Sequence, residues 1–254
     1  MVVAVEYISK EESAGVEAAK HGVTGILAVQ GAFAEHAAML DRLGAPWKLL
    51  RAAEDFDDSI DRVILPGGES TTQAKLLHEL GLMDPLRKRI KEGMPVLATC
   101  AGLILLAETV DGTGDLDNLN PAAAQNRLQV KGLGTMPITV RRNAYGRQLG
   151  SFHAEGRWEE GAKGTEEAAG ATCVADAKDY SSNSATLASE PVPLTFIRAP
   201  RIEATGPGVE PLVTLNDAPV AVRHRNQIAA AFHPELDDDN RLYEALLAPL
   251  KRAY

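Results

Sequence analysis

The sequence predicts an α/β fold in which a mostly parallel sheet carries helices on both faces and gains antiparallel strands in its second half. Apolar runs of strand length alternate with amphipathic runs of helix length over about the first 110 residues, the pattern of parallel α/β units. The later part instead contains short apolar runs separated by turn-rich segments. A chain of 254 residues is long enough to bury one large core.

The first predicted strand is GILAVQG (25–31), a compact apolar run that Gly31 ends. The helix AFAEHAAMLDRLG follows it, and Gly44 supplies a left-handed end. Spacings of three and four residues give this helix one apolar face. That face consists of Phe33, Ala37, Leu40 and Leu43.

Further strands and a helix extend the pattern as far as a central cysteine. WKLL predicts the second strand, and RVILPGGES predicts a third strand that runs into a glycine turn. The helix PLRKRIKE follows, with Asp84 as its N-cap, Pro85 in its first turn and Gly93 at its end. The run PVLATCAGLILLAE then changes from strand to helix at Cys100. The helical spacing after the cysteine is marked by Leu103, Leu106 and Ala107.

The second half is predicted to complete a single domain, residues 23–254, with the strands ITV, LTFI, LVTL, VAV and QIAAAF. Residues 111–132 and 159–191 are predicted as surface insertions in this domain. Residues 1–22 are either a short strand and helix packed on the domain or an N-terminal extension. A final helix at about 238–252 begins with acidic and ends with basic residues, which matches the helix dipole.

The composition excludes several classes of function. With 45% hydrophobic residues, 24% charged residues and a net charge of −9, the chain is an ordinary globular protein that repels phosphate backbones, so nucleic acid is not expected as a ligand. Two cysteines, Cys100 and Cys173, cannot form a disulfide framework and suit a reducing compartment. No run approaches the roughly 20 apolar residues of a membrane span, and the N-terminus does not resemble a signal peptide. We therefore expect a cytoplasmic protein.

Cys100 stands at the corner between strand and helix, where an open α/β sheet binds its ligands. The free N–H groups and the dipole at the start of the helix favour a reactive thiolate there. The backbone N–H of Ala101 can stabilise an oxyanion, as the residue after the serine does in hydrolase elbows. A buried structural cysteine is the alternative. Cys173 lies in an insertion without such a context and is predicted to be incidental.

A cysteine nucleophile needs a base, and the base needs a group that orients it. His233, in AAAFHPEL, comes at the end of an apolar strand, and Glu235 follows two residues later, where it can hold the imidazole. An isolated His-x-Glu is more often a surface histidine, so the cysteine corner is what favours the catalytic interpretation. The histidines show no metal-ligand spacing, and neither a metal nor another cofactor is predicted.

The glycine turn LPGGES (65–70) ends another strand of the same sheet and should open at the same edge. Gly67 and Gly68 let backbone N–H groups approach a ligand closely. A phosphate loop is one alternative, although the GxxxxGK[ST] pattern is absent, and a plain β-turn is the other.

Together, TCAG with Cys100, FHPE with His233 and Glu235, and PGGES resemble the triad glutamine amidotransferases. More specific segments narrow the resemblance to the glutaminase subunits of pyridoxal 5′-phosphate synthase, in the family's order and over roughly residues 23–252. These segments are AVQGAFAEH (28–36), LPGGESTT (65–72), TCAGLI (99–104), RRNAYGRQ (141–148), FIRAP (196–200) and AAFHPEL (230–236).

The resemblance implies a flavodoxin-like three-layer α/β/α sandwich and hydrolysis of L-glutamine to L-glutamate and ammonia through a cysteine thioester. Cys100 would be the nucleophile, with His233 and Glu235 as its relay, and backbone N–H groups at Gly68 and Ala101 would bind the oxyanion. Ammonia would pass to a separate (βα)8-barrel subunit in a hetero-oligomer, which builds pyridoxal 5′-phosphate, the vitamin B6 cofactor, from a pentose phosphate and a triose phosphate. The glutamine contacts implied by the matching motifs are Gly68, Glu69, Ser70, Arg142, Ile197 and Arg198.

The chain departs from the family at its N-terminal segment, at its two long insertions, at VRHRNQIAAAF, which replaces a glutamine–glycine turn, and at His153, where the family usually carries glutamate. Two other functions remain open. The chain could serve another amidotransferase, such as a partner in histidine or anthranilate biosynthesis, or be a different cysteine hydrolase, although RRNAYGRQ and FIRAP argue against this. It could also be a non-enzymatic interaction subunit, against which the intact triad argues.

Overall fold

The computed structural model describes residues 22–111, 131–142, 144, 150–159 and 191–248. The predictions for the N-terminal segment, for the two insertions and for Cys173 therefore fall, apart from a few edge residues, outside the described residues.

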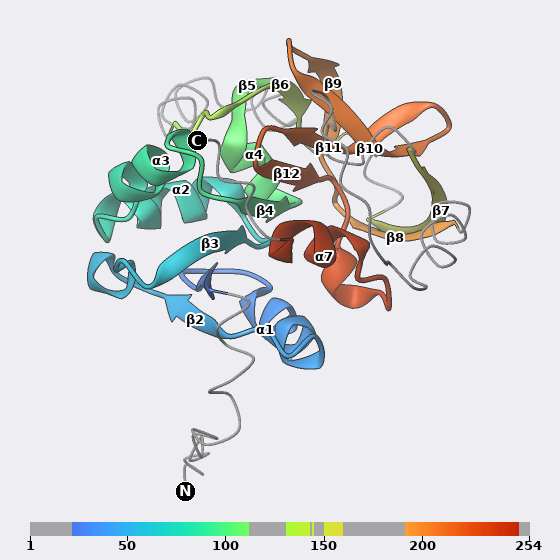
Figure 1. Cartoon of the computed structure of the whole chain (residues 1–254). Helices are drawn as coiled ribbons and strands as arrows, with labels where there is room; N and C mark the ends of the chain where they lie inside the picture. Colours follow the sequence, from blue (N-terminus) through green and yellow to red (C-terminus); the bar gives the residue numbers. More distant parts are fainter. Residues whose placement is uncertain (1–21, 112–130, 143, 145–149, 160–190, 249–254) are drawn as a thin grey trace, which may run out of the picture.

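A nine-stranded sheet forms the centre of the molecule (Figure 1). In spatial order, its parallel half consists of β2 (Trp47–Leu50), β1 (Val23–Leu27), β3 (Ile60–Leu65), β4 (Val96–Thr99) and β12 (Gln227–Ala230). The antiparallel half continues with β11 (Ala218–His224), β10 (Val209–Leu215), β7 (Ser151–Trp158) and β8 (Val192–Ile197). A separate three-stranded sheet contains β5 (Ala107–Asp111), β6 (Met136–Arg141) and β9 (Arg201–Thr205).

Helices cover both faces of the parallel half (Figure 1). One face carries α1 (Phe33–Arg42) and α7 (Arg241–Leu247), and the other carries α2 (Ser70–Glu79), α3 (Met83–Lys91) and α4 (Ala101–Leu106). Two short 3-10 helices, η1 (Ala53–Asp55) and η3 (Pro234–Leu236), lie in the connections. This arrangement confirms the predicted three-layer α/β/α fold, with antiparallel additions in the second half of the chain.

The parallel strands are buried on both faces, which explains their nearly continuous apolar sequences. Ile26, Ile64, Leu97 and Ile228 form one row across four neighbouring strands, and each is almost completely buried. Because the strands run in the same direction, their carboxyl ends meet at one edge of the sheet. The glycine turn after β3, the corner after β4 and the segment after β12 therefore lie at the same edge.

The sequence does not predict β5, β7 or β9. β7 reads SFHAEGRW, in which Phe152, Ala154 and Trp158 alternate with polar residues, so the strand pattern is present even though only Gly156 is fully buried. α4 is also shorter than expected, because Ala107 adopts an extended conformation and pairs with Met136 of β6 instead of continuing the helix.

Three predicted helix ends are wrong. α3 begins one residue before Asp84, whose carboxylate lies in the first turn and accepts a hydrogen bond from Arg87 at 3.1 Å instead of capping the helix. The C-terminal helix begins at Arg241, because Asp239 accepts the backbone N–H of Arg241 at 2.9 Å from outside the helix. It ends before residue 252, since Ala248 leaves the helical conformation.

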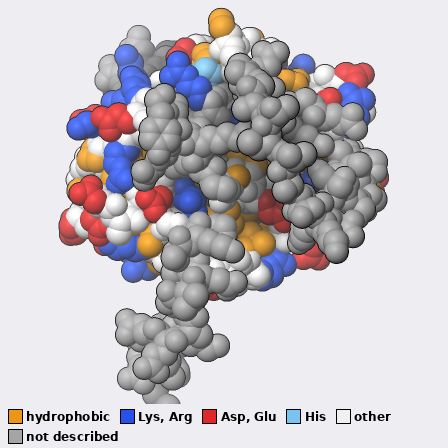
Figure 2. All heavy atoms as spheres, in the orientation of Figure 1, with side chains coloured by type: hydrophobic (Ala, Val, Ile, Leu, Met, Phe, Trp, Pro, Cys, Tyr) orange, Lys and Arg blue, Asp and Glu red, His pale blue; other side chains and the backbone are white. Residues whose placement is uncertain are grey.

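On the face drawn in Figure 2, Lys and Arg side chains are interspersed with Asp and Glu instead of gathering in one basic patch among the described residues. None of the helices in the described ranges combines the length and the apolar character that crossing a membrane requires.

Candidate active site

Cys100 lies at the turn from β4 to α4, and its side chain is buried. Its backbone angles, φ 47° and ψ −98°, lie in a region that residues other than glycine rarely adopt and that is typical of strained functional turns. Its N–H donates to the Ala230 carbonyl at 2.8 Å, which ties the turn to β12. A Cβ added at Gly102 would lie 2.1 Å from the carbonyl oxygen of Leu65, so the tight turn requires glycine there.

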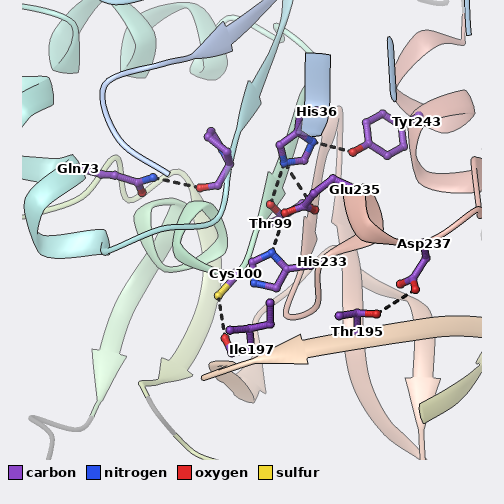
Figure 3. Close-up of polar contacts among 11 residues, drawn as sticks. His36, Gln73, Thr99, Cys100, Thr195, Ile197, His233, Glu235, Asp237 and Tyr243 are labelled. Carbon is purple, nitrogen blue, oxygen red and sulfur yellow. Dashed lines mark hydrogen bonds and ion pairs between the residues drawn. The ribbon is translucent and has the colours of Figure 1, made fainter. Parts of the chain in front are cut away.

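His233 and Glu235 follow β12, the neighbour of β4, at the same edge of the sheet. His233 Nδ1 and Glu235 Oε1 are 2.6 Å apart, and both side chains are buried (Figure 3). The backbone N–H of His233 donates to the Thr195 carbonyl at 2.8 Å, and Pro234 starts η3 directly after it. The main chain around the imidazole is therefore held on both sides.

Competing effects set the charges of this pair. Burial disfavours the charged imidazole, but the contacts with Cys100 and Glu235 prevail and raise the pKa of His233 to about 10. Burial also disfavours the Glu235 carboxylate, but the neighbouring His36 and His233 prevail and lower its pKa. At neutral pH the pair is an imidazolium and a carboxylate, so His233 has a proton to give.

The thiol and the imidazole meet against Gly67. A Cβ added to this glycine would lie 2.4 Å from His233 Cε1 and 3.5 Å from Cys100 Cβ. Because Nδ1 binds Glu235, Nε2 is the nitrogen left for the thiol, and it is buried without a hydrogen-bond partner among the described residues. Cys100 Sγ lies 3.8 Å from the carbonyl oxygen of Ile197 at the end of β8 (Figure 3). The imidazole of His233 thus lies between the Cys100 thiol and the Glu235 carboxylate.

Glu69 and Ser70 begin α2 beside this site. The Glu69 carboxylate caps the helix, accepting the backbone N–H groups of Thr71 at 3.2 Å and Thr72 at 2.6 Å. Burial opposes ionisation of Glu69, but hydrogen bonds from both threonines lower its pKa. Ser70 is buried as the first residue of the helix. The capping role of Glu69 is not apparent from the sequence, and its two oxygens keep acceptor capacity for a further donor.

The two predicted arginines lie at different places around the site. Arg142 Nη1 donates to Thr71 Oγ1 at 3.0 Å, which places this guanidinium beside the start of α2. Its Nε atom is buried and has no hydrogen-bond partner in the described part of the chain. Arg198 follows β8 with a positive φ of 46°, its N–H donates to the Gly150 carbonyl at 2.7 Å, and its side chain is exposed.

The two predicted oxyanion donors lie in different segments, one directly after the cysteine and the other in the glycine turn after β3. Ala101 is the first residue of α4, where a backbone N–H has no partner within the helix. Gly68 follows the glycine that borders both Cys100 and His233, and a Cβ there would lie 2.5 Å from Gln30 Oε1.

Two glutamines that the sequence does not single out hold the glycine turn in place. Gln30 Oε1 accepts the backbone N–H of Glu69 at 2.8 Å. Gln73 Nε2 donates to the Gln30 carbonyl at 2.9 Å and to the Pro66 carbonyl at 3.2 Å. Gln30 lies in a segment that carries the family resemblance and Gln73 directly follows another. A polar residue directly after an apolar strand is the signal that could have identified Gln30.

Comparisons with known proteins identify the family of the chain. The SNO glutamine amidotransferase family matches residues 26–250. The chain is 49% identical over 227 residues to the pyridoxal 5′-phosphate synthase subunit PdxT of Bifidobacterium adolescentis, a match covering 89% of this chain and 100% of that protein. It is 44% identical over 223 residues to the protein of the same name from Desulfitobacterium hafniense, covering 88% of this chain and 90% of that protein.

A solved structure gives the same result for the fold. A crystal structure of a glutamine amidotransferase is 36% identical in sequence and matches with a TM-score of 0.69, covering 89% of this chain and 97% of that one. The extent of the family match and these identities leave no ambiguity about ancestry. The chain belongs to the SNO glutamine amidotransferase family.

Proposed function

We propose that this chain hydrolyses L-glutamine to L-glutamate and ammonia as the glutaminase subunit of a pyridoxal 5′-phosphate synthase, in vitamin B6 biosynthesis. The observation that carries the proposal is the buried set of Cys100, His233 and Glu235 at the β4–α4 corner of an amidotransferase fold. The names of the related PdxT proteins support the choice of synthase.

In the proposed reaction, the Cys100 thiolate, paired with the His233 imidazolium, attacks the side-chain amide carbon of glutamine and forms a C–S bond. The C–N bond then breaks, and the His233 imidazolium gives its proton to the departing nitrogen, which leaves as ammonia. The neutral imidazole next takes a proton from water, whose oxygen attacks the γ-glutamyl thioester. Cleavage of the C–S bond releases glutamate and a proton and restores the thiolate beside the imidazolium, while Glu235 keeps the imidazole in one orientation.

Stabilisation of the oxyanion is assigned to backbone N–H groups at Gly68 and Ala101, each worth about 3 kcal/mol in reactions of this type. The α-carboxylate of glutamine is assigned to Arg142, whose Nε has no other partner among the described residues, and to Arg198. The Glu69 carboxylate, which retains acceptor capacity, suits the α-ammonium group of glutamine. Ser70 and the Ile197 carbonyl, which lies beside the thiol, complete the proposed contacts.

The proposed partner is a (βα)8-barrel synthase subunit, bound in a hetero-oligomer, to which ammonia passes without release. Two exposed apolar side chains beside the site support a covering partner. Ile197 is 38% exposed where its carbonyl meets the thiol, and Leu236 is 47% exposed directly after Glu235. Two cysteines that cannot form a disulfide framework suit a reducing compartment, so we propose that the protein is cytoplasmic.

The test is a glutaminase assay of the chain with and without the matching synthase subunit, using wild type and Cys100→Ala. The proposal expects glutamate production that requires Cys100 and increases with the synthase. Glutamate production by Cys100→Ala at the wild-type rate would refute the proposed nucleophile. Copurification with a different synthase would refute the proposed partner, and failure of a glutamine-analogue electrophile to label Cys100 would favour a non-enzymatic subunit.

A further inference from the structure

A second histidine lies behind the triad carboxylate, and the reaction as described does not use it. His36, on α1, is completely buried. Its Nε2 lies 3.6 Å from Glu235 Oε2 and 3.2 Å from Thr99 Oγ1, and its Nδ1 lies 2.6 Å from the hydroxyl oxygen of Tyr243 on α7. Figure 3 shows these side chains converging from α1, β4, η3 and α7 on the side of Glu235 away from Cys100.

The contacts fix which nitrogen of His36 carries the proton. An ionised carboxylate only accepts hydrogen bonds, so Nε2, which faces Glu235, is the N–H of the neutral ring. Its hydrogen-bond partner is Thr99 Oγ1 at 3.2 Å, and the carboxylate oxygen lies farther away at 3.6 Å. Nδ1 is then the acceptor, and the Tyr243 hydroxyl donates to it. Tyr243 is itself completely buried, so its hydroxyl holds the ring in this tautomer.

The surroundings also keep His36 and Tyr243 neutral. Burial lowers the pKa of His36, as does the neighbouring His233, while Glu235 and Glu35 act in the opposite direction without prevailing. Burial raises the pKa of Tyr243 well above its usual value. A neutral imidazole gives Glu235 an N–H without neutralising the negative charge that His233 uses. A protonated His36 would compete with His233 for the same carboxylate.

The second oxygen of Glu235 depends on this contact. Oε2 is buried and has no hydrogen-bond partner in the described part of the chain, so His36 Nε2 at 3.6 Å is the group that faces it. Burying a carboxylate oxygen without such a group costs free energy, and it leaves the carboxylate free to turn. Turning of the carboxylate would move Oε1 and, with it, the imidazole.

We propose that His36, backed by Tyr243, is a positioning residue for glutamine hydrolysis, which holds Oε2 of Glu235 and thereby fixes the orientation of His233. This inference rests on the proposed roles of Cys100, His233 and Glu235. The contact at 3.6 Å is longer than a hydrogen bond, so it acts as an electrostatic contact in the free protein. Catalytic contacts of this kind commonly shorten when substrate binds.

The test measures kcat and KM for glutamine in the full chain with its synthase subunit. His36→Met, which removes the N–H at similar volume, should lower kcat about tenfold, the scale of one lost hydrogen bond to a charged group. KM should stay within about twofold, because His36 does not touch the substrate. His36→Gln, which keeps an N–H donor, should recover most of the rate. The matched control is His224→Met on β11, where the histidine Nδ1 lies 3.0 Å from the Gly208 carbonyl oxygen, and it should leave kcat unchanged.

A double-mutant cycle separates positioning from support of the fold. If His36 acts through Glu235, His36→Met should cause no further loss in a Glu235→Ala background. Losses that multiply in the double variant would overturn the proposal. If His36→Met fails to fold, Tyr243→Phe removes only one oxygen, and it should lower kcat about threefold by releasing the tautomer.

The proposed function is checked in the same experiment. Turnover by Cys100→Ala would refute the proposed function itself. Inactive Cys100→Ala together with wild-type kcat in both His36→Met and Tyr243→Phe would overturn only the positioning role.

Discussion

Gly67 offers a direct test of the catalytic geometry, because its Cα borders both Cys100 and His233. In Gly67→Ala, the new Cβ would lie 2.4 Å from His233 Cε1 and 3.0 Å from His233 Nδ1. Ordinary van der Waals contact begins at 3.4 Å, so the ring or the glycine turn must move by about 1 Å. Glu235 holds the ring at 2.6 Å on one side, and the Gly67 carbonyl is held by Ala32 N–H at 3.0 Å on the other.

The displacement therefore changes the position of the imidazole relative to the thiol. A misplacement of about 1 Å in a catalytic group costs about 100-fold in rate, or about 2.7 kcal/mol in the activation barrier. We expect Gly67→Ala to lower kcat by this factor while the domain remains folded, since the clash is with one side chain and not with the core.

The assay is glutamate release with the synthase subunit present, with thermal unfolding measured in parallel. Gly44→Ala is the matched control. Its Cβ would meet nothing within 4 Å, but its φ of +64° makes alanine strained, so it should lower stability by about 1 kcal/mol and leave kcat unchanged. A kcat for Gly67→Ala within about twofold of wild type would show that the imidazole does not work from the position described here.

Three further predictions concern the same site. His233→Ala should approach Cys100→Ala in loss of glutaminase activity, because the base serves both steps, whereas Glu235→Ala should be milder; equal losses would mean that the carboxylate does more than orient. Arg142→Lys should raise KM for glutamine more than it slows labelling of Cys100 by a small thiol reagent, because lysine cannot bind a carboxylate with two parallel bonds; an unchanged KM would remove Arg142 from the substrate site. Because the pKa of His233 is raised from 6.5 to about 10 in the fold, its protonated ring stabilises the fold fully below about pH 6.5, and this stabilisation is lost as pH rises to about 10. In denaturant titrations, the free energy of unfolding of wild type should therefore exceed that of His233→Gln by less and less across that interval. A difference that does not change with pH would contradict a charged His233.

The sequence allowed the edge of the sheet and the cysteine corner to be predicted because both depend on local patterns. The change from strand to helix at Cys100 is visible in neighbouring residues, and the order of the chain places His233 at the end of a strand. The partnership of the strands that carry them, β4 and β12, depends on the fold as a whole. Once parallel strands are inferred, however, their carboxyl ends must share an edge.

What could not be predicted depends on residues far apart in the chain. His36 and Tyr243 are separated by 207 positions. Nothing in the sequence around either residue distinguishes a role behind Glu235 from ordinary core packing. The capping role of Glu69 could not be separated from its implied substrate contact, because both use the same carboxylate. β7 is a different case, because Phe152, Ala154 and Trp158 alternate with polar residues and pack against the core, so a local strand signal was present and was overlooked.

Two hydrogen bonds tether the glycine turn to residues 30–32, and they bear on control of the reaction. The Gly67 carbonyl accepts Ala32 N–H at 3.0 Å, and Glu69 N–H donates to Gln30 Oε1 at 2.8 Å, so both peptides around Gly68 are held. Rotation of the Gly67–Gly68 peptide, which would redirect its N–H toward the oxyanion, must break the first bond at a cost of about 1 kcal/mol. Adjacent glycines keep the steric cost low. We expect docking of the synthase to offset this cost, so that the isolated chain is nearly inactive.

Synthase addition should then raise kcat much more than it lowers KM, because a donor gained at the oxyanion stabilises the transition state and not the bound substrate. The measurement is a titration of the chain with its synthase subunit at saturating and at low glutamine. Free ammonia is lost to water as ammonium, so a glutaminase that is silent without its partner avoids wasting glutamine. Steady turnover by the chain alone, unchanged when the synthase is added, would show that the oxyanion site is already complete and that the tether on the glycine turn has no part in control.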